Sequence, residues 1–288
     1  MKIPTRLEPL VEAGLVDTVS RQLMSGKEAM VYVVRCGDDI RCAKIYKEAN
    51  LRSFRQSVDY TEGRRVKNSR RARAMEKGSR YGRKAKEEAW QSTEVDALYR
   101  LAAAGVRVPQ PHNFIDGVLL MELVTDAEGN PAPRLNDVVL TPEQAREVHR
   151  TLIREVVRML CAGVVHGDLS EYNVLLGSRG SDIEPVIIDL PQAVDAAGNA
   201  HARSILERDV GNLTAYLGRF APEILNTEYG KEIWALYQSG SLTPEIELTG
   251  RFERIDKAVD VDGVIRLVDD ALKEEAKRQL YRAELGQK

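Results

Sequence analysis

The chain has no apolar run long enough to cross a membrane and no cysteine spacing typical of a disulfide scaffold or a zinc site. Its apolar runs fall short of the ~18 residues that a spanning helix needs, and residues 1–6 are not followed by the apolar stretch of a signal peptide. Cys36, Cys42 and Cys161 are odd in number and lack CxxC spacing. We therefore expect a cytoplasmic protein with reduced cysteines and no membrane segment.

The composition is that of a folded globular protein rather than a disordered one. The chain has 288 residues, of which 43% are hydrophobic and 30% are charged, and its mean hydropathy is -0.34. Such a chain can bury a sizeable core in one large or two modest domains. It contains no internal repeat, and from its length we expect no added partner-binding domain.

A net charge of only -2 hides a strong separation of charge along the chain. Residues 64–86 contain eleven basic residues and one acid, Glu76, so this stretch carries +10 and the rest must carry -12. The basic residues are Arg64, Arg65, Lys67, Arg70, Arg71, Arg73, Lys77, Arg80, Arg83, Lys84 and Lys86. The stretch has almost no large apolar residues and predicts a mobile loop with some helical turns.

The first part of the chain predicts a small β-rich region. Runs rich in Val, Ile and Tyr, separated by turns, indicate an antiparallel meander, and their bounds are 15–23, 29–36 and 40–46. Residues 87–104 have helical spacing and end at Gly105, after which Pro109 and Pro111 stop further helix. Residues 117–121 then predict a buried strand.

The second part predicts mostly helix. Residues 126–133 form a turn-rich linker and the best candidate boundary. Thr141 as N-cap and Pro142 at the first helical position indicate a long helix that ends near Gly163. Two short β segments follow, at residues 174–176 and 186–188, and the chain beyond Ser204 predicts helices.

The segment from His166 to Asn173 carries the clearest chemistry. Asp168 and Asn173 are five residues apart on a predicted tight loop, where the carboxylate could orient a hydroxyl or water while the amide oxygen binds Mg²⁺. Asp189 ends a later apolar run, where kinases place their other metal ligand. The occurrence of these three residues in this order, each after the expected element, favours a site for phosphoryl transfer. The alternative is that they are only solvated residues of turns.

Phosphoryl transfer also needs cationic groups for the nucleotide phosphates. Lys44 on an early strand fits this role, and its expected ion-pair partner is Glu94, with Glu87 and Glu88 as alternatives. No GxGxxG is present. In its place the turn at residues 24–29 offers backbone N–H groups, the Ser25 hydroxyl and Lys27 for phosphate contact.

These segments resemble the RIO family of atypical serine/threonine protein kinases, most closely its RIO1 branch in a short, bacterial-type form. The resemblance runs from about residue 15 to about residue 215, and Ser-Glu-Tyr at 170–172 and Pro-Ala-Pro at 131–133 are distinctive. The other matching segments are Ser25-Gly-Lys-Glu-Ala29, the Lys44 strand, Trp90 with Glu94, and residues 118–124, 134–137, 166–173 and 188–194.

The resemblance implies an α+β, bilobal protein-kinase-like fold without a full activation segment. It places a β-rich N-lobe at residues 1–122, with a basic loop at about 62–88 and an αC-like helix, and a mostly helical C-lobe at 123–288. It implies ATP and Mg²⁺ as cofactors, with Mn²⁺ as an alternative metal, and Ser or Thr of a protein as acceptor.

The resemblance also implies roles for individual residues. Asp168 would be the catalytic base, Asn173 and Asp189 would bind Mg²⁺, and Asp189 could itself accept phosphate in an ATPase-like cycle. The residues expected to contact or position ATP are Ser25, Lys27, Lys44, Glu94, Met121, Glu122 and Val124, with the backbones of Glu122 and Val124 holding adenine.

Some features depart from the family's pattern. Leu190-Pro191 stands where Val-Gly is usual and should stiffen the turn after Asp189, and residues 177–185 form a longer link than expected. Ala221-Pro222-Glu223 spells a kinase triplet in the wrong order relative to Asp209, so Pro222 is expected only to open a helix. Gly167 replaces the arginine that receives an activation-loop phosphate in other kinases.

Two other functions remain open. A small-molecule kinase of the aminoglycoside type also uses His-Gly-Asp, but usually with His-Pro where this chain has residues 170–172. An ATPase-type assembly factor for the small ribosomal subunit is the second. In that case residues 64–86 would bind ribosomal RNA or a pre-ribosomal particle through phosphate contacts, because Tyr81 is the only ring there for stacking.

Overall fold

The computed structural model describes residues 3–26, 29–47, 93–180 and 182–252. Residues up to Arg251 form one compact unit and residues 252–288 a second, of which only Phe252 is described. The predicted boundary between residues 122 and 123 falls inside the first unit and stays a prediction. Within the described ranges, no helix combines the length and hydropathy needed to cross a bilayer.

A five-stranded antiparallel sheet forms the β-rich part, in the order β1-β2-β3-β5-β4. Its strands are β1 (Thr18–Ser25), β2 (Ala29–Cys36), β3 (Asp39–Tyr46), β4 (Pro111–Ile115) and β5 (Val118–Glu122). The predicted meander and buried strand are confirmed, although β1 begins at Thr18 rather than at Leu15. Strand β4 was not predicted, because Pro109 and Pro111 were interpreted only as stop signals.

Pro111 is tolerated at the first residue of β4 because of the strand's position. Among the described strands, β4 lies at the edge of the sheet and pairs with β5 alone. A proline has no N–H to donate, so strands accept it at an edge or at a first residue. A proline therefore marks the beginning of an edge strand here as well as a stop for helix.

The two faces of the sheet pack against different elements, because successive residues of a strand point to opposite faces. On one face, Ala43 and Ile45 of β3 join a cluster with Leu7 and Leu10 from the helix α1 (Glu8–Glu12) and its N-terminal flank. On the other face, Tyr46 joins the main core with apolar residues of the helix at 93–103. That second face carries Lys44.

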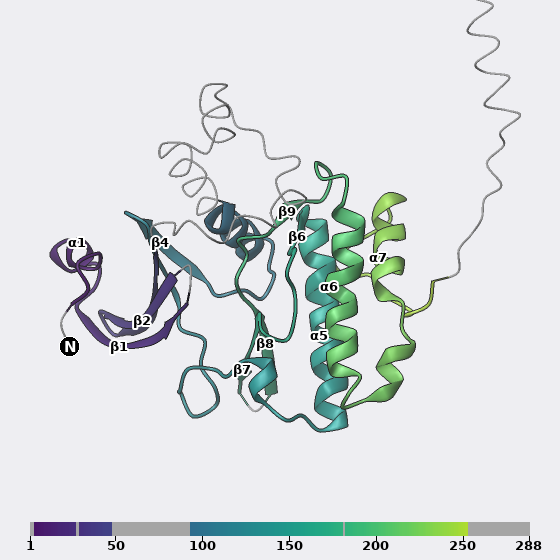
Figure 1. The fold of residues 1–288 in the computed structure, drawn as a ribbon, viewed down its shortest axis with the longest axis horizontal. Helices are drawn as coiled ribbons and strands as arrows, with labels where there is room; N and C mark the ends of the chain where they lie inside the picture. Colours follow the sequence, from purple (N-terminus) through teal and green to yellow (C-terminus); the bar gives the residue numbers. More distant parts are fainter. Residues whose placement is uncertain (1–2, 27–28, 48–92, 181, 253–288) are drawn as a thin grey trace, which may run out of the picture. The chain divides into compact units, whose positions relative to one another are not determined.

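Three helices lie side by side in the second part, as Figure 1 shows. They are α5 (Pro142–Cys161), α6 (Ala202–Leu217) and α7 (Tyr229–Gln238). The short helical turns are η2 (Leu135–Asp137) and η3 (Pro222–Asn226). Two small antiparallel pairs complete it, β6 (Val164–Val165) with β9 (Val194–Asp195) and β7 (Val174–Arg179) with β8 (Asp182–Ile187).

Helix α5 begins as its sequence predicts. The Thr141 hydroxyl accepts a hydrogen bond from the N–H of Gln144, and the Gln144 side chain accepts one from the N–H of Thr141. This capping box satisfies two backbone donors that no helix turn can reach. The helix stops at Cys161, shortly before Gly163, whose φ of 72° favours glycine.

Two departures in the sequence have structural explanations. The long link at residues 177–185 is the hairpin of β7 and β8, which turns at Gly180 with a φ of 66°. Pro222 opens a 3-10 helix, η3, as its position predicts. The β-rich part and the helical part together give the predicted α+β architecture.

Candidate active site

Lys44 lies between two carboxylates from distant parts of the chain. Its Nζ is 2.5 Å from Oε1 of Glu94 and 3.1 Å from Oδ1 of Asp189. Burial by itself would lower the pKa of Lys44, but the charges of Glu94 and Asp189 outweigh it and raise that pKa. The structure thus brings together three residues that the sequence places 50 and 145 positions apart.

The loop after β6 holds Asp168 in a defined orientation. His166 Nε2 lies 3.0 Å from the carbonyl oxygen of Ile188, so this nitrogen carries the proton and donates. His166 Nδ1 then accepts from the N–H of Asp168 at 3.2 Å. Burial raises the pKa of Asp168, and the nearby charge of Asp189 adds to the rise. A carboxylate with a raised pKa is suited to proton transfer.

Asn173 and Asp189 supply different oxygen ligands near Asp168. The Asn173 amide nitrogen donates to the Asp168 carbonyl oxygen at 2.8 Å, which leaves the amide oxygen for another ligand. Among the described residues no group of three His, Cys, Asp or Glu side chains could hold a metal alone. One amide and one carboxylate oxygen nevertheless fit Mg²⁺, which usually completes its coordination with phosphate and water.

Asp189 has an unusual backbone conformation. Its φ is 68°, in a region that non-glycine residues seldom occupy and that Asp tolerates better than most. The Leu190-Pro191 turn is compatible with this conformation: Leu190 is buried, and its carbonyl oxygen accepts from the N–H of Ala193 at 3.0 Å. Gln192 then reaches back to Asp168 Oδ2 at 3.4 Å.

Helix α6 holds the catalytic loop through two residues that were considered only for their order in the sequence. Buried Asp209 accepts from the N–H of Gly167 at 2.7 Å, and Arg208 donates to the Gly167 carbonyl oxygen at 2.5 Å. The φ of 88° at Gly167 explains why glycine occupies this position. The expectation that Gly167 offers no side chain to an activation-loop phosphate stays a prediction, and Arg208 of α6 binds the backbone of this residue.

The turn between β1 and β2 is bound by a lysine that sequence reasoning missed. Lys47 donates to the Ser25 hydroxyl at 3.2 Å and to the Gly26 carbonyl oxygen at 2.6 Å. Lys47 follows β3 and stands three positions after Lys44, so the pairing of β2 with β3 brings it to the turn. The predicted phosphate contact Lys27 lies outside the described residues.

Of the residues expected to hold adenine, Met121 and Glu122 end β5 and Val124 follows it, and we call Met121 to Val124 the hinge. Some polar groups of the hinge are already bonded. The N–H of Glu122 donates to the Gln110 carbonyl oxygen at 2.8 Å. The carbonyl oxygen of Val124 accepts from Ala132 at 2.9 Å. Met121 pairs with Cys42 of β3, on the sheet face that carries Lys44.

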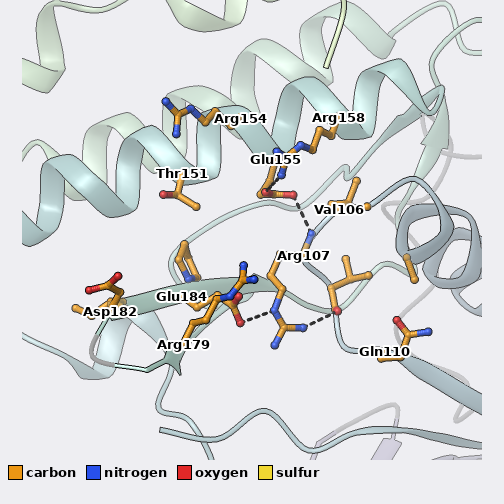
Figure 2. A pocket seen from close by; sticks show the side chains of 15 residues that line it. Val106, Arg107, Gln110, Thr151, Arg154, Glu155, Arg158, Arg179, Asp182 and Glu184 are labelled. Carbon is orange, nitrogen blue, oxygen red and sulfur yellow. Dashed lines mark hydrogen bonds and ion pairs between the residues drawn. The ribbon is translucent and has the colours of Figure 1, made fainter. Parts of the chain in front are cut away.

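A cavity of about 500 Å³ lies elsewhere, and neither Lys44, Asp168, Asn173 nor Asp189 lines it. Figure 2 shows Arg107 in its wall, with its backbone N–H donating to Glu155 and its side chain to Glu184. The same guanidinium binds the Glu122 carboxylate at 2.7 and 2.8 Å. Arg107 therefore ties the hinge to β8 and α5.

Several predicted features lie outside the described residues. They are Trp90, the alternative partners Glu87 and Glu88, and the basic stretch at residues 64–86. Glu94 is described and contacts Lys44. The roles assigned to these site residues stay predictions.

Comparisons with known proteins agree with the resemblance seen in the sequence. The family model of the RIO domain matches residues 30–229. The RIO-type serine/threonine-protein kinase Rio1 of Haloferax volcanii is 39% identical over 213 residues, which cover 73% of this chain and 67% of that protein. The Serine/threonine-protein kinase rio1 of Schizosaccharomyces pombe is 31% identical, over 73% of this chain but 40% of that protein.

A solved structure supports the fold. The Rio2 kinase of Chaetomium thermophilum, in a complex described as ADP/Mg²⁺-phosphoaspartate, matches 74% of this chain and 59% of that chain. The TM-score is 0.53 at 22% sequence identity, so this likeness concerns the fold alone. The family match and the relative from Haloferax volcanii show that the chain belongs to the RIO family of serine/threonine protein kinases.

Proposed function

We propose that this protein is an ATP- and Mg²⁺-dependent serine/threonine protein kinase that also turns over ATP through its own Asp189. The observation that carries the proposal is the placement of Lys44 between Glu94 and Asp189. An ammonium held by a helix glutamate and directed at a metal-binding carboxylate is the arrangement that kinases use for nucleotide phosphates.

The sheet face around Lys44 suits an adenine ring. Val31, Val33 and Cys42 are buried, yet they belong to neither of the two hydrophobic clusters. By the strand register they share the face of Lys44. At the hinge, no described residue accepts a hydrogen bond from the N–H of Val124, which supports an adenine contact there.

The remaining residues supply proton transfer and charge neutralisation. Asp168 would accept the proton of the attacking hydroxyl, and its raised pKa favours that step. Bound Mg²⁺ would neutralise the charge on the transferring phosphoryl group. Asn173 and Asp189 would hold the metal, while Lys44 would hold the phosphates. Mn²⁺ is an alternative metal for the same oxygen ligands.

The kinase proposal predicts that Asp168→Asn and Asp189→Asn each lower ATP turnover by at least about a hundredfold, because general-base and metal functions each contribute on this scale. Turnover would be measured with Mg²⁺ under saturating ATP. Asp116→Asn is the matched control, since Asp116 also has a positive φ, 48°, but stands at an exposed turn. Near wild-type turnover in either active-site variant would refute the proposal.

A second experiment separates protein phosphorylation from an ATPase cycle. In that cycle a carboxylate oxygen of Asp189 attacks the γ-phosphorus, ADP leaves, and water then releases phosphate from the aspartyl-phosphate. Labelled ATP should therefore produce label on the chain that hydroxylamine removes, as expected of an acyl phosphate, and that Asp189→Asn abolishes. Label found only on Ser or Thr would exclude the Asp189 step and leave the protein kinase.

A second candidate function is an ATPase-type assembly factor that binds ribosomal RNA or a pre-ribosomal particle. The observation that favours it is the +10 charge of residues 64–86 in an otherwise acidic chain. This charge suits contact with phosphates without base reading.

A further inference from the structure

We propose that Tyr46 is a positioning residue, whose hydroxyl donates a hydrogen bond to Oε2 of Glu94 and so holds the Lys44–Glu94 pair in its working orientation. The proposal rests on the proposed function, because it assigns Tyr46 a part in setting the phosphate-binding lysine. It concerns the chain's own residues, however, and can be tested without nucleotide.

The strand places Tyr46 beside the ion pair. Tyr46 stands two residues after Lys44 on β3, so both side chains lie on the same face of the sheet. Lys44 Nζ is 5.3 Å from the centre of the Tyr46 ring. The ring also meets Phe114 edge to face, with centroids 6.2 Å apart. These contacts fix the ring and therefore the direction of its hydroxyl.

Among the described residues, two buried polar atoms of this cluster have no hydrogen-bond partner. The Tyr46 side chain is only 1% exposed, and its hydroxyl has no hydrogen bond of normal geometry among the described residues. The same holds for Oε2 of Glu94, whose other oxygen is bonded to Lys44. Buried polar atoms without partners are costly, so an isolated pair of this kind calls for an explanation.

The two atoms are chemically complementary, and both of their side chains contact Lys44. A phenol donates and a carboxylate oxygen accepts. Burial, together with the charge of Glu94 and then that of Asp189, raises the pKa of Tyr46, so its hydroxyl keeps its proton. A hydrogen bond from the Tyr46 hydroxyl to Oε2 of Glu94 would satisfy both atoms at once.

Closing this bond would affect Lys44 through Glu94. A carboxylate bonded at one oxygen can rotate about its own axis, whereas one bonded at both oxygens cannot. With Glu94 fixed, the Lys44 ammonium stays directed at Asp189 and at the phosphates. The hydroxyl therefore acts on chemistry through positioning, and Tyr46 touches no reacting atom.

Tyr46→Phe removes the hydroxyl and keeps the ring. We expect kcat for ATP turnover to fall about tenfold, as the loss of one hydrogen bond to a charged group predicts, while KM for ATP changes less than twofold. Tyr32→Phe is the matched control, because its hydroxyl contacts Met30 Sδ on the opposite face of the sheet. Wild-type kcat in Tyr46→Phe would overturn the proposal.

Hydrogen exchange of the nucleotide-free chain is the second measurement. Amides of residues 93–103 should exchange several-fold faster in Tyr46→Phe than in wild type or Tyr32→Phe, because the helix loses one of its ties to the sheet. In a Glu94→Ala background the same change should have no further effect. Equal exchange in Tyr46→Phe and wild type, or an undiminished effect without Glu94, would refute the bond.

The two proposals fail in different ways. If Asp168→Asn and Asp189→Asn keep full turnover, the proposed function is wrong, while exchange still decides whether Tyr46 holds Glu94. If those variants lose turnover and Tyr46→Phe does not, the function stands and the role of Tyr46 is refuted.

Discussion

Burial separates the carboxylates that are available for chemistry from those that hold the structure. Burial raises the pKa of both Asp168 and Asp209. Asp209 is 1% exposed and accepts the backbone N–H of Gly167, so its oxygens already serve the loop. Asp168 is exposed, and among the described residues its carboxylate has only long contacts at 3.4 Å. A raised pKa is thus found both at Asp209, which binds the backbone of the loop, and at Asp168, the candidate base.

His149 shows burial acting on stability. It lies in α5 with Nε2 3.2 Å from the Thr214 hydroxyl and its ring near Tyr229, and burial lowers its pKa to about 4. In the unfolded chain a histidine titrates near 6.5. Below pH 6.5 the unfolded state therefore binds more protons than the folded state. The contribution of neutral His149 to the free energy of unfolding is fully present above pH 6.5 and is lost as the pH falls toward 4.

We predict that lowering the pH from 7 to 5 costs wild type about 2 kcal/mol through His149 alone, and that His149→Gln lacks this loss. Glutamine can keep the hydrogen bond to Thr214 but does not titrate. Urea unfolding of both proteins at the two pH values measures how much the free energy of unfolding changes with pH in each. Comparing the two changes removes the effect of the carboxylates, which titrate in both proteins. Parallel pH dependence in the two proteins would contradict the assignment.

At the scale of elements, β3 contributes to both faces of the sheet, because its successive side chains point to opposite faces. Ala43 and Ile45 build the cluster with α1, while Cys42, Lys44 and Tyr46 build the face of the candidate site. A shift of the strand register by one residue would exchange the two sets. The regular pairing of β3 with both β2 and β5 prevents such a shift.

Helix α5 gives a prediction at the same scale. Thr141→Ala removes the hydroxyl that accepts from Gln144 and should lower the free energy of unfolding by about 1 kcal/mol. ATP turnover should stay at the wild-type level, because Thr141 contacts no site residue described above. Thr141→Ser, which keeps the cap, is the control in chemical denaturation. Equal stability of all three proteins would show that the capping box contributes nothing.

At the scale of the whole molecule, charge is distributed unevenly. The net charge of -2 combines +10 at residues 64–86 with -12 elsewhere. The acidic remainder would repel RNA, so any affinity for phosphates must depend on the basic stretch. This stretch lies outside the described residues, and its proposed partner rests on the sequence.

Deleting residues 64–86 should therefore reduce binding to ribosomal RNA at low salt by at least about tenfold and flatten the dependence of the affinity on salt. Filter binding across a salt series measures both quantities. A chain in which the same arginines and lysines are replaced by glutamine separates charge from length. Unchanged binding after the deletion would remove RNA from the list of partners.

The sequence by itself determined the elements and the types of chemistry. The sequence signals depend on a few neighbouring residues: the runs of β2 and β3 rich in Val, Ile and Tyr, the Thr141–Pro142 start of α5, and the order of Lys44, Asp168, Asn173 and Asp189. Local patterns of this kind can be recognised without a structure. Strand β4 was missed because the meaning of Pro111 depends on its place at the sheet edge.

Only the tertiary structure decided which of these residues meet. Lys44 contacts Glu94 and Asp189, 50 and 145 positions away, and Arg208 and Asp209 reach Gly167 from α6. The same holds for the buried hydroxyl of Tyr46 beside the free oxygen of Glu94. Contacts between distant segments depend on how sheet and helices pack, and no local pattern records that packing.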